Sequence, residues 1–328
     1  MVVARVIDHL PSDIHRAATE NNSDSVMEVR DPKAFISSLS RWYGRSMNTP
    51  IHDAIEQHSA DWFGATVKAL YEKSDIETMI RLLTTGNKIN ETPLSLMVTK
   101  DKLNDFFLQL LRNWERPDDR VRFVSQIMDE DSQTTAFHQA ITNKCSSAGL
   151  SGILHSLEKP EHMAEVLKRQ DSEGKTVLHL ASIQPNGANL LNCLLEPIKR
   201  YKAYMFDAMK CVTNSKETFL HIISKQPKLN ASVANVAISK IGMLDTASAV
   251  ELLEIKNRTG QSAIHLAAQC DTFDKNSVFL KIFKCAATIV IERNPLAILS
   301  IQDNNNDTAL HLALRSCLLT VGPAVKEL

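Results

Sequence analysis

Apolar residues along this chain recur with the spacing of helices rather than of strands. In residues 60–73, ADWFGATVKALYEK, the residues Phe63, Val67 and Leu70 follow the spacing i, i+4, i+7, which places them on one face of a helix. Helical patterns of the same kind recur in two later segments, residues 103–116 and 149–159. The chain is therefore predicted to form a succession of short amphipathic helices.

One short motif recurs through these helices: a threonine or serine, any residue, an apolar residue, and a histidine. Its copies are Ser12 to His15, Thr49 to His52, Thr135 to His138, Thr176 to His179, Thr218 to His221, Ser262 to His265 and Thr308 to His311. A further copy, Thr92 to Ser95, carries serine in place of histidine. From Thr49 on, the threonine or serine positions lie 41 to 46 residues apart. Such a period indicates an array of supersecondary units, each too small to bury its own apolar face. We expect one array over residues 1–328, with repeats starting near residues 12, 49, 92, 135, 176, 218, 262 and 308.

These residues resemble a known family. Thr-Pro-Leu-His-x-Ala opens the first helix of an ankyrin repeat, and the segments TPIHDA, TVLHLA, SAIHLAA and TALHLA are similar to it. Residues 171–176 and 257–262 resemble the turn tip of that family, and residues 74–86 resemble its outer helix and the turn that follows. The resemblance covers roughly residues 12–320. It implies an all-α fold, an elongated helical solenoid with short turn tips or β-hairpins.

The length of the repeat departs from the family. Ankyrin repeats have a period of about 33 residues, whereas the step here is near 43. About ten extra residues lie between the Thr-x-Leu-His helix and the outer helix, and they form either a third helix or an extension of the two others. Long, irregular repeats also resemble those of bacterial effector proteins that act inside host cells.

The motif residues suit a structural role at the start of a helix. A threonine before a helix can accept hydrogen bonds from the free N–H groups of the first turn. A neutral histidine has one donor and one acceptor, so it can bond this threonine and backbone in the nearby turn. The apolar residue two past the threonine, as in Ile51, Leu178 and Leu310, is expected to point inward, and the repeat with Ser95 is expected to be looser. The structural set is Thr49, His52, Thr135, His138, Thr176, His179, Thr218, His221, Ser262, His265, Thr308 and His311.

Composition narrows the class of protein. Of 328 residues, 44% are hydrophobic and 23% are charged, which is typical of a folded soluble chain. The net charge is −1, so we expect no nucleic-acid partner. No apolar run approaches the ~18 residues that span a bilayer, and the start of the chain lacks the apolar stretch of a signal peptide. The six cysteines form no Cys-x-x-Cys motif, which favours a reducing, cytoplasmic setting.

Candidate catalytic and ligand-binding groups are few. Cysteine and histidine are close in sequence at His138 and Cys145, His265 and Cys270, and His311 and Cys317. Each of these histidines belongs to the recurring column, so we expect neither a thiol nucleophile nor enzyme activity. No histidine spacing fits zinc, and no glycine-rich phosphate loop is present, so no metal or cofactor is expected. The acidic residues 129–131 are interpreted as a solvated turn, and the basic residues of 199–202 as a solvated helix face.

The resemblance also implies where a partner would bind. In ankyrin repeats, partners usually dock on the concave side, which consists of turn tips and inner helices. The tip positions are Arg45, Asn48, Lys88, Glu91, Ser172, Glu173, Lys175, Glu217, Arg258, Gln261, Asn304, Asn305 and Asp307. The inner-helix positions are Glu56, Gln57, Lys100, Asn143, Gln184, Lys225, Gln226, Gln269 and Arg315. Trp42, Tyr43 and Arg45 are residue types that dominate binding hot spots. The alternative is that Trp42 and Tyr43 pack on the first repeat as a cap.

The predicted function is therefore that of a protein–protein interaction module. We expect a monomer that binds a partner protein in the cytoplasm, or in the cytosol of a host cell if the chain is an effector. The alternative is a substrate-recognition arm of a larger enzyme whose catalytic domain is not in this chain. Only twenty residues follow Thr308, fewer than a repeat needs. We expect the natural chain to continue past Leu328, or this end to pack against something else.

Overall fold

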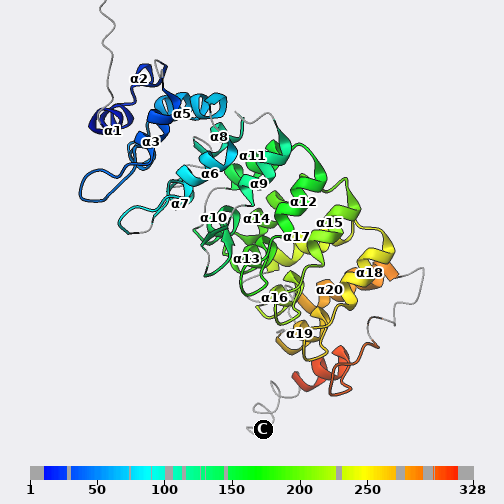
Figure 1. Ribbon diagram of the computed structural model, residues 1–328. Helices are drawn as coiled ribbons and strands as arrows, with labels where there is room; N and C mark the ends of the chain where they lie inside the picture. The colour runs from blue at the N-terminus through cyan, green and yellow to red at the C-terminus, as the bar shows by residue number, and fades with distance from the viewer. Residues whose placement is uncertain are drawn as a thin grey trace, which may run out of the picture. The chain divides into compact units, whose positions relative to one another are not determined.

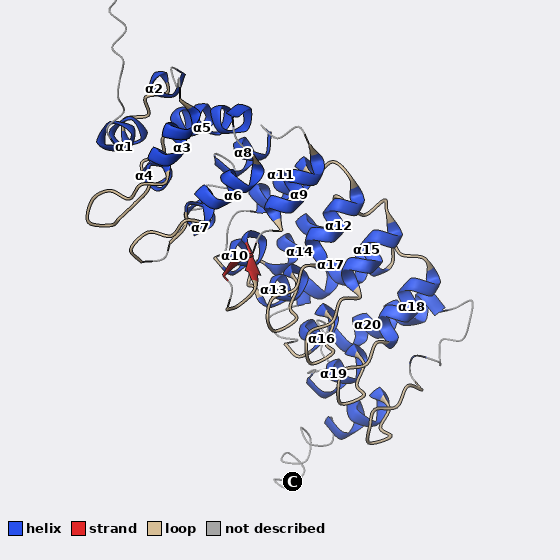
Figure 2. Ribbon diagram, in the orientation of Figure 1, coloured by secondary structure: helices blue, strands red, loops and turns tan. Residues whose placement is uncertain are grey.

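Helices dominate the computed structural model of the chain (Figure 2). The structure describes residues 11–27, 31–73, 75–89, 91–99, 106–112, 116–125, 127–129, 131–143, 147–226, 231–270, 278–290, 298 and 300–316. Contacts divide the chain into two compact units. The first comprises residues 1–130 and 135–158, and the second comprises residues 131–134 and 159–328. The single array expected from the sequence stays a prediction.

The first unit contains most of the shorter helices. They are α1 (Pro11–Thr19), α2 (Asp24–Met27), α3 (Pro32–Leu39), α4 (Pro50–Glu56), α5 (Ala60–Lys73), α6 (Ile76–Thr84), α7 (Pro93–Thr99), α8 (Leu108–Arg112), α9 (Pro117–Val124), α10 (Ala136–Thr142) and α11 (Ser147–Ser156). Two short strands, β1 (Ile127–Asp129) and β2 (Thr134–Thr135), pair with each other just before α10. The fold is thus all-α apart from local pairing at a turn.

The second unit continues the same succession of helices. They are α12 (Pro160–Lys168), α13 (Val177–Ile183), α14 (Gly187–Leu195), α15 (Lys202–Met209), α16 (Phe219–Ser224), α17 (Ala231–Ile241), α18 (Thr246–Glu254), α19 (Ala263–Cys270) and α20 (Val278–Val290).

In the described residues, the five repeats that start at Thr49, Thr92, Thr135, Thr176 and Thr218 each contain three helices, which decides between the two alternatives for the extra residues there. The repeat that starts at Thr49 comprises α4, α5 and α6, and the one that starts at Thr218 comprises α16, α17 and α18. In both repeats, an aspartate side chain caps the start of the third helix. Asp75 accepts the Thr78 N–H at 2.7 Å before α6, and Asp245 accepts the Ser248 N–H at 2.9 Å before α18.

Equivalent helices of successive repeats pack against each other in both units (Figure 1). In the first unit, α4 packs against α1 and α7, and α5 packs against α2 and α8. In the second, α16 lies between α13 and α19, α17 between α14 and α20, and α15 between α12 and α18. Each unit is therefore a helical solenoid of ankyrin-like repeats in which three helices, rather than two, form stacked rows.

The core lies between these rows and is mostly aliphatic. On α6, Met79, Ile80, Leu82 and Leu83 are all buried. One buried charge crosses between repeats: the Lys240 ammonium of α17 donates to the Glu196 carboxylate after α14 at 2.6 Å. The bonds from Lys199 and Lys240 lower the pKa of Glu196 to about 2, so this carboxylate stays ionised opposite the buried lysine.

Within the described ranges, none of the helices has the length and apolar character needed to cross a membrane.

Candidate protein-binding surface

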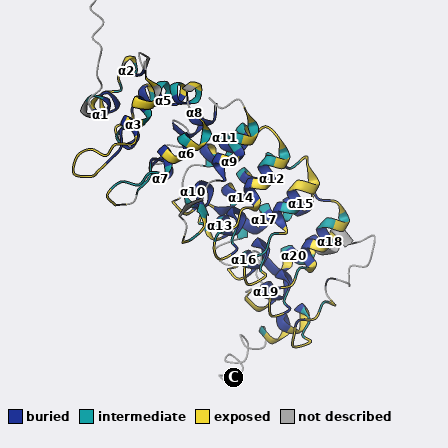
Figure 3. Cartoon of the chain, in the orientation of Figure 1, coloured by how far each residue is buried: buried dark blue, intermediate teal, exposed yellow. Residues whose placement is uncertain are grey.

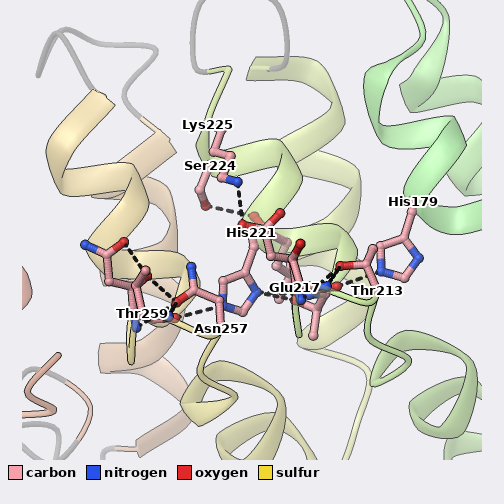
Figure 4. A network of polar contacts seen from close by, with 12 residues as sticks. His179, Thr213, Glu217, His221, Ser224, Lys225, Asn257 and Thr259 are labelled. Atoms are coloured by element: carbon pink, nitrogen blue, oxygen red, sulfur yellow. Dashed lines mark hydrogen bonds and ion pairs between the residues drawn. The ribbon is translucent and has the colours of Figure 1, made fainter. Parts of the chain in front are cut away.

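The Thr-x-x-His motif forms a capping box in which histidine takes the place usually held by glutamate or glutamine. At α16, the Thr218 backbone N–H donates to His221 Nδ1 at 3.1 Å, and the Thr218 hydroxyl lies 2.8 Å from the same nitrogen. Figure 4 shows His221 within the network of polar contacts around this helix start. The Thr218 side chain in turn accepts the backbone N–H at the third helical position. The same box opens α4, α10 and α13. The bond expected between threonine and histidine is therefore present, and it closes the first turn of the helix.

In His52, His179, His221 and His265, the other ring nitrogen reaches the next repeat, which the sequence reasoning did not foresee. His221 Nε2 lies 3.1 Å from the Gln261 carbonyl, and His179 Nε2 lies 2.9 Å from the Glu217 carbonyl. In the first unit, His52 Nε2 lies 2.8 Å from the Glu91 carbonyl. Each of these carbonyls belongs to the residue just before the next threonine or serine of the motif. The histidine thus joins the helix start of one repeat to that of the next.

These bonds determine the charge state of the ring. A carbonyl can only accept, so Nε2 carries the proton and donates it, and Nδ1 accepts from the cap N–H. Burial lowers the pKa of His179 and His221 to about 4, and it also lowers the pKa of His52 and His265. The buried rings are therefore neutral near pH 7. Protonation would place a second N–H at Nδ1, facing the backbone N–H that this nitrogen accepts.

Three copies of the motif differ from this arrangement. His15 Nδ1 lies 2.7 Å from Asp53 Oδ2 in the next repeat, and its Nε2 lies 3.3 Å from the Arg41 carbonyl. The Ser95 hydroxyl accepts the Thr92 N–H at 2.9 Å, as the histidines do, and donates to the Thr92 carbonyl. The serine therefore supplies the bonds of its own turn.

The third exception is the motif at His311, and it corrects an expectation. His311 keeps the bond to Thr308, with Nδ1 2.8 Å from the hydroxyl, but the ring is exposed. Leu310, expected to point inward, is 46% exposed, whereas Ile51 and Leu178 are buried. The helices of Ile51 and Leu178 are followed by a stacked repeat, and within the described residues the helix of Leu310 is not.

Five turn tips are held by an acceptor side chain five residues before the motif threonine or serine. Asp171 Oδ1 accepts the N–H groups two and four residues on, at 2.9 and 2.8 Å, which is the geometry of an Asx turn. Four other residues do the same in their tips: Asn87, Thr213, Asn257 and Asp303. The sequence placed tips by position in other repeats too, but it matched the turn pattern of the family only at Asp171 and Asn257. The fixed offset from the threonine column would have found the other acceptor side chains.

Backbone bonds then join neighbouring tips into a ladder. In the second unit, the N–H of Asn214 donates to the Glu173 carbonyl at 2.9 Å. The N–H of Arg258 donates to the Ser215 carbonyl, and that of Asn304 to the Thr259 carbonyl, each at 3.2 Å. The side chains of Asn214 and Asn304 add to this ladder, because their amides donate to the Ser172 and Arg258 carbonyls at 2.9 and 3.3 Å.

The tip of α13 supplies a test of this ladder. Gly174 has φ of +75°, and a Cβ there would lie 2.6 Å from the Asn214 backbone nitrogen. We expect Gly174→Ala to lower the free energy of unfolding by about 2 kcal/mol or more, from the left-handed backbone and the clash. Lys216 holds the same place in the next tip at φ of 59°, so Lys216→Gly is expected to be neutral or to stabilise by up to about 1 kcal/mol. Urea unfolding measures both variants, and equal effects of the same sign would contradict the explanation.

The structure places most residues of the predicted binding surface on exposed tips and helix ends (Figure 3). Exposed residues of that set are Trp42, Tyr43, Arg45, Glu56, Gln57, Ser172, Glu173, Lys225, Gln226, Arg258, Gln269, Asn304, Asn305 and Arg315. Lys175, Gln261 and Asp307 are half-buried. Asn48 is a correction: it is buried, and its amide donates to Asp53 Oδ1 at 2.9 Å, so it holds the tip together.

Of the residues weighed for catalysis, His138, His265 and His311 are bonded in their capping turns, Cys270 is exposed, and two cysteines lie outside the described residues. Both ring nitrogens of His265 are bonded, to Ser262 and to the Ile301 carbonyl at 3.0 Å. Cys145 and Cys317 lie outside the described residues. Burial raises the pKa of the Cys285 thiol to about 11, which keeps it protonated near pH 7. Among the side chains that the structure places, no group of three or more histidine, cysteine, aspartate or glutamate residues could hold a metal ion.

Comparison with known proteins gives a limited result. No family model matches the chain, and no curated protein matches it. Similar solved structures include the ankyrin repeat domain of Bcl-3, described as a unique member of the IkappaB protein family. It is 17% identical, with a TM-score of 0.44, over 81% of this chain and 94% of that one. An ankyrin repeat protein from Leishmania major is 14% identical, with a TM-score of 0.37, over 96% and 80%. The repeats are called ankyrin-like because of their geometry: a capped first helix, a turn tip and stacked rows of equivalent helices.

Proposed function

We propose that the chain is a protein–protein interaction module that binds a partner through its turn tips and the adjacent ends of the first helices. The observation that carries this proposal is that different residues of each tip hold its shape and face the solvent. The Asx-type side chain holds its own turn and the backbone joins neighbouring tips, whereas the two residues at each crest are exposed; of these, Asn214 and Asn304 also bond the preceding tip. In the second unit, these crest residues are Ser172 and Glu173, Asn214 and Ser215, Arg258 and Thr259, and Asn304 and Asn305.

Such an arrangement suits recognition of another protein surface. The crest side chains are polar and of mixed charge. They recur on hydrogen-bonded tips that are already ordered before a partner binds. A preordered frame loses little conformational entropy when it binds, so each modest polar contact contributes more to affinity. No step of this proposal requires a reacting group, which fits the neutral, fully bonded histidines behind the tips.

A pull-down with the whole chain tests the proposal. The charge-reversed double variant Glu173→Lys with Arg258→Glu is expected to lower recovery of a bound protein about tenfold or more, because both changes lie on crests. Glu161→Lys, an exposed residue in the first turn of α12, is the matched control and should leave recovery unchanged. Equal recovery by the double variant and the unmodified chain would contradict binding at these tips.

The cellular setting is a further part of the proposal. The long repeat, now explained by a third helix, is the feature that resembles bacterial effectors, and a host protein would then be the partner. The unmodified chain and the double variant are each expressed in a eukaryotic cell and cross-linked to the proteins bound there. The captured proteins are then compared with those captured from a bacterial lysate. Selective capture from the bacterial lysate alone would contradict the host setting.

A further inference from the structure

Two neighbouring tips of the first unit expose apolar side chains in a way that the tips of the second unit do not. We use the name apolar tip patch for Trp42, Tyr43, Met47 and Ile89. Their exposed fractions are 55%, 53%, 38% and 72%. The two tips are joined directly, because the Lys88 N–H donates to the Ser46 carbonyl at 3.0 Å and the Asn87 amide donates to Asn48 Oδ1 at 3.0 Å. Large apolar groups gathered on adjacent turns mark an interaction site more often than scattered single ones do.

The tip that carries Trp42 and Tyr43 is held in shape from beneath. Tyr43 and Asn48 form an antiparallel bridge, with the Tyr43 N–H 2.8 Å from the Asn48 carbonyl. The Tyr43 ring lies 4.9 Å from the His15 ring, which is itself bonded to Asp53. Tyr43 therefore packs on the first repeat and remains half exposed. The cap and the hot spot, weighed as alternatives from the sequence, are compatible at this residue.

Three basic side chains on or beside these tips form no ion pair within the part of the chain that the structure describes. Arg41, Arg45 and Lys88 are exposed, and no carboxylate of the described residues forms an ion pair with any of them. The nearest acidic groups along these tips are already engaged. Asp53 binds His15 and Asn48, and Glu56 accepts a bond from the Asn48 amide at 3.2 Å. Besides Asp53 and Glu56, these two tips carry one more carboxylate, that of Glu91, which is half-buried at the end of the second tip.

We propose that the apolar tip patch binds an acidic segment of a partner protein in which carboxylates alternate with large apolar side chains. This inference rests on the proposed function and adds the chemistry of the partner. Apolar side chains of the segment would cover Trp42 and Ile89, while its carboxylates would pair with Arg41, Arg45 and Lys88. A basic segment would meet like charges, and an uncharged one would leave the arginines unpaired where water is removed, so charge complementarity selects the acidic segment.

Titration calorimetry of the full chain with short synthetic peptides tests this assignment. The probe peptide alternates Asp and Glu with Leu and Phe. One comparison peptide carries Lys in place of the acidic residues, and the other carries Ser in place of the apolar ones. We expect the probe to bind, each comparison peptide to bind about tenfold or more weakly, and added salt to weaken the probe.

Paired variants locate the site on the molecule. Trp42→Ala with Ile89→Ser, and Arg45→Glu with Lys88→Glu, should each weaken the probe about tenfold or more. Arg258→Glu, the same substitution on a crest of the second unit, should not. Circular dichroism checks that each variant is folded, which is expected because every changed residue is exposed.

Three results would overturn the inference: no binding of the probe, equal binding of all three peptides, or an equal loss with Arg258→Glu. The proposed function has a separate outcome. If the crest variants of the second unit reduce partner recovery and the variants of the apolar tip patch do not, the module binds proteins but the patch is not its acidic-segment site.

Discussion

His221→Ala is expected to lower the free energy of unfolding by about 3–5 kcal/mol. The substitution empties a fully buried ring position and leaves two buried backbone groups without their partner, the Thr218 N–H and the Gln261 carbonyl. Each unpaired buried group costs about 1–3 kcal/mol, and the cavity adds to that. Urea-induced unfolding, followed by circular dichroism, gives the value.

Two further variants separate the parts of this effect. His221→Gln keeps an acceptor for the Thr218 N–H, as in a common capping box, but loses the ring geometry that reaches Gln261. It should cost about half as much as the alanine variant. His155→Ala removes an exposed histidine that bonds only within its own helix, and it should change stability by less than about 0.5 kcal/mol. A His221→Ala protein as stable as the His155→Ala protein would show that the histidine column contributes no tie between repeats.

Acidification is expected to destabilise the fold before its carboxylates titrate. His179 and His221 have a pKa near 4 in the folded chain because of burial, against about 6.5 for an exposed histidine. As the pH falls below about 6.5, these histidines become protonated in the unfolded chain but remain neutral in the folded chain. The stabilisation is therefore complete above about pH 6.5, declines below it, and is lost as the pH falls through about 4. At about pH 5 each ring should account for a loss of about 2 kcal/mol.

Urea titrations at about pH 7, 6 and 5 measure this dependence, and His52 and His265 should add to it with the same sign. The double variant His179→Gln with His221→Gln is the control. It should start from a lower stability and lose less between pH 7 and 5. Carboxylates with lowered pKa values, such as Asp75 and Asp245, contribute mainly below about pH 5. An unchanged slope in the double variant would assign the acid sensitivity to groups other than the buried histidines.

Several features of the fold were open to prediction because they depend on residues close together in sequence. The Thr218 to His221 bond spans three residues, and the Asp171 turn spans four, so both leave a fixed spacing in the chain. Repetition at 41 to 46 residues then revealed a solenoid. The third helix was not decided by the pattern, because an apolar stripe fits a separate short helix and a lengthened one equally well.

The candidate site was predicted less completely than the fold. Trp42, Tyr43 and Arg45 were singled out by residue type and Lys88 was assigned to a tip by position, but Met47, Ile89 and Arg41 were not recognised as part of the same surface. Nothing in the local sequence shows that the two tips are adjacent, since the bond from Lys88 to Ser46 joins residues of different repeats. Asn48 was assigned to the surface by position and is buried, because its partners lie on α4 and on the next tip.

By itself, the sequence determined the repeat, its capped first helix and the position of each histidine within a turn, since these follow from short-range hydrogen bonding and helical periodicity. The tertiary structure alone decided which atoms those histidines reach some forty residues away, which tip side chains remain exposed, and which charges stay unpaired. The physical reason is the same in each case. Burial and charge compensation are properties of neighbours in space, and in stacked repeats those neighbours belong to the next repeat.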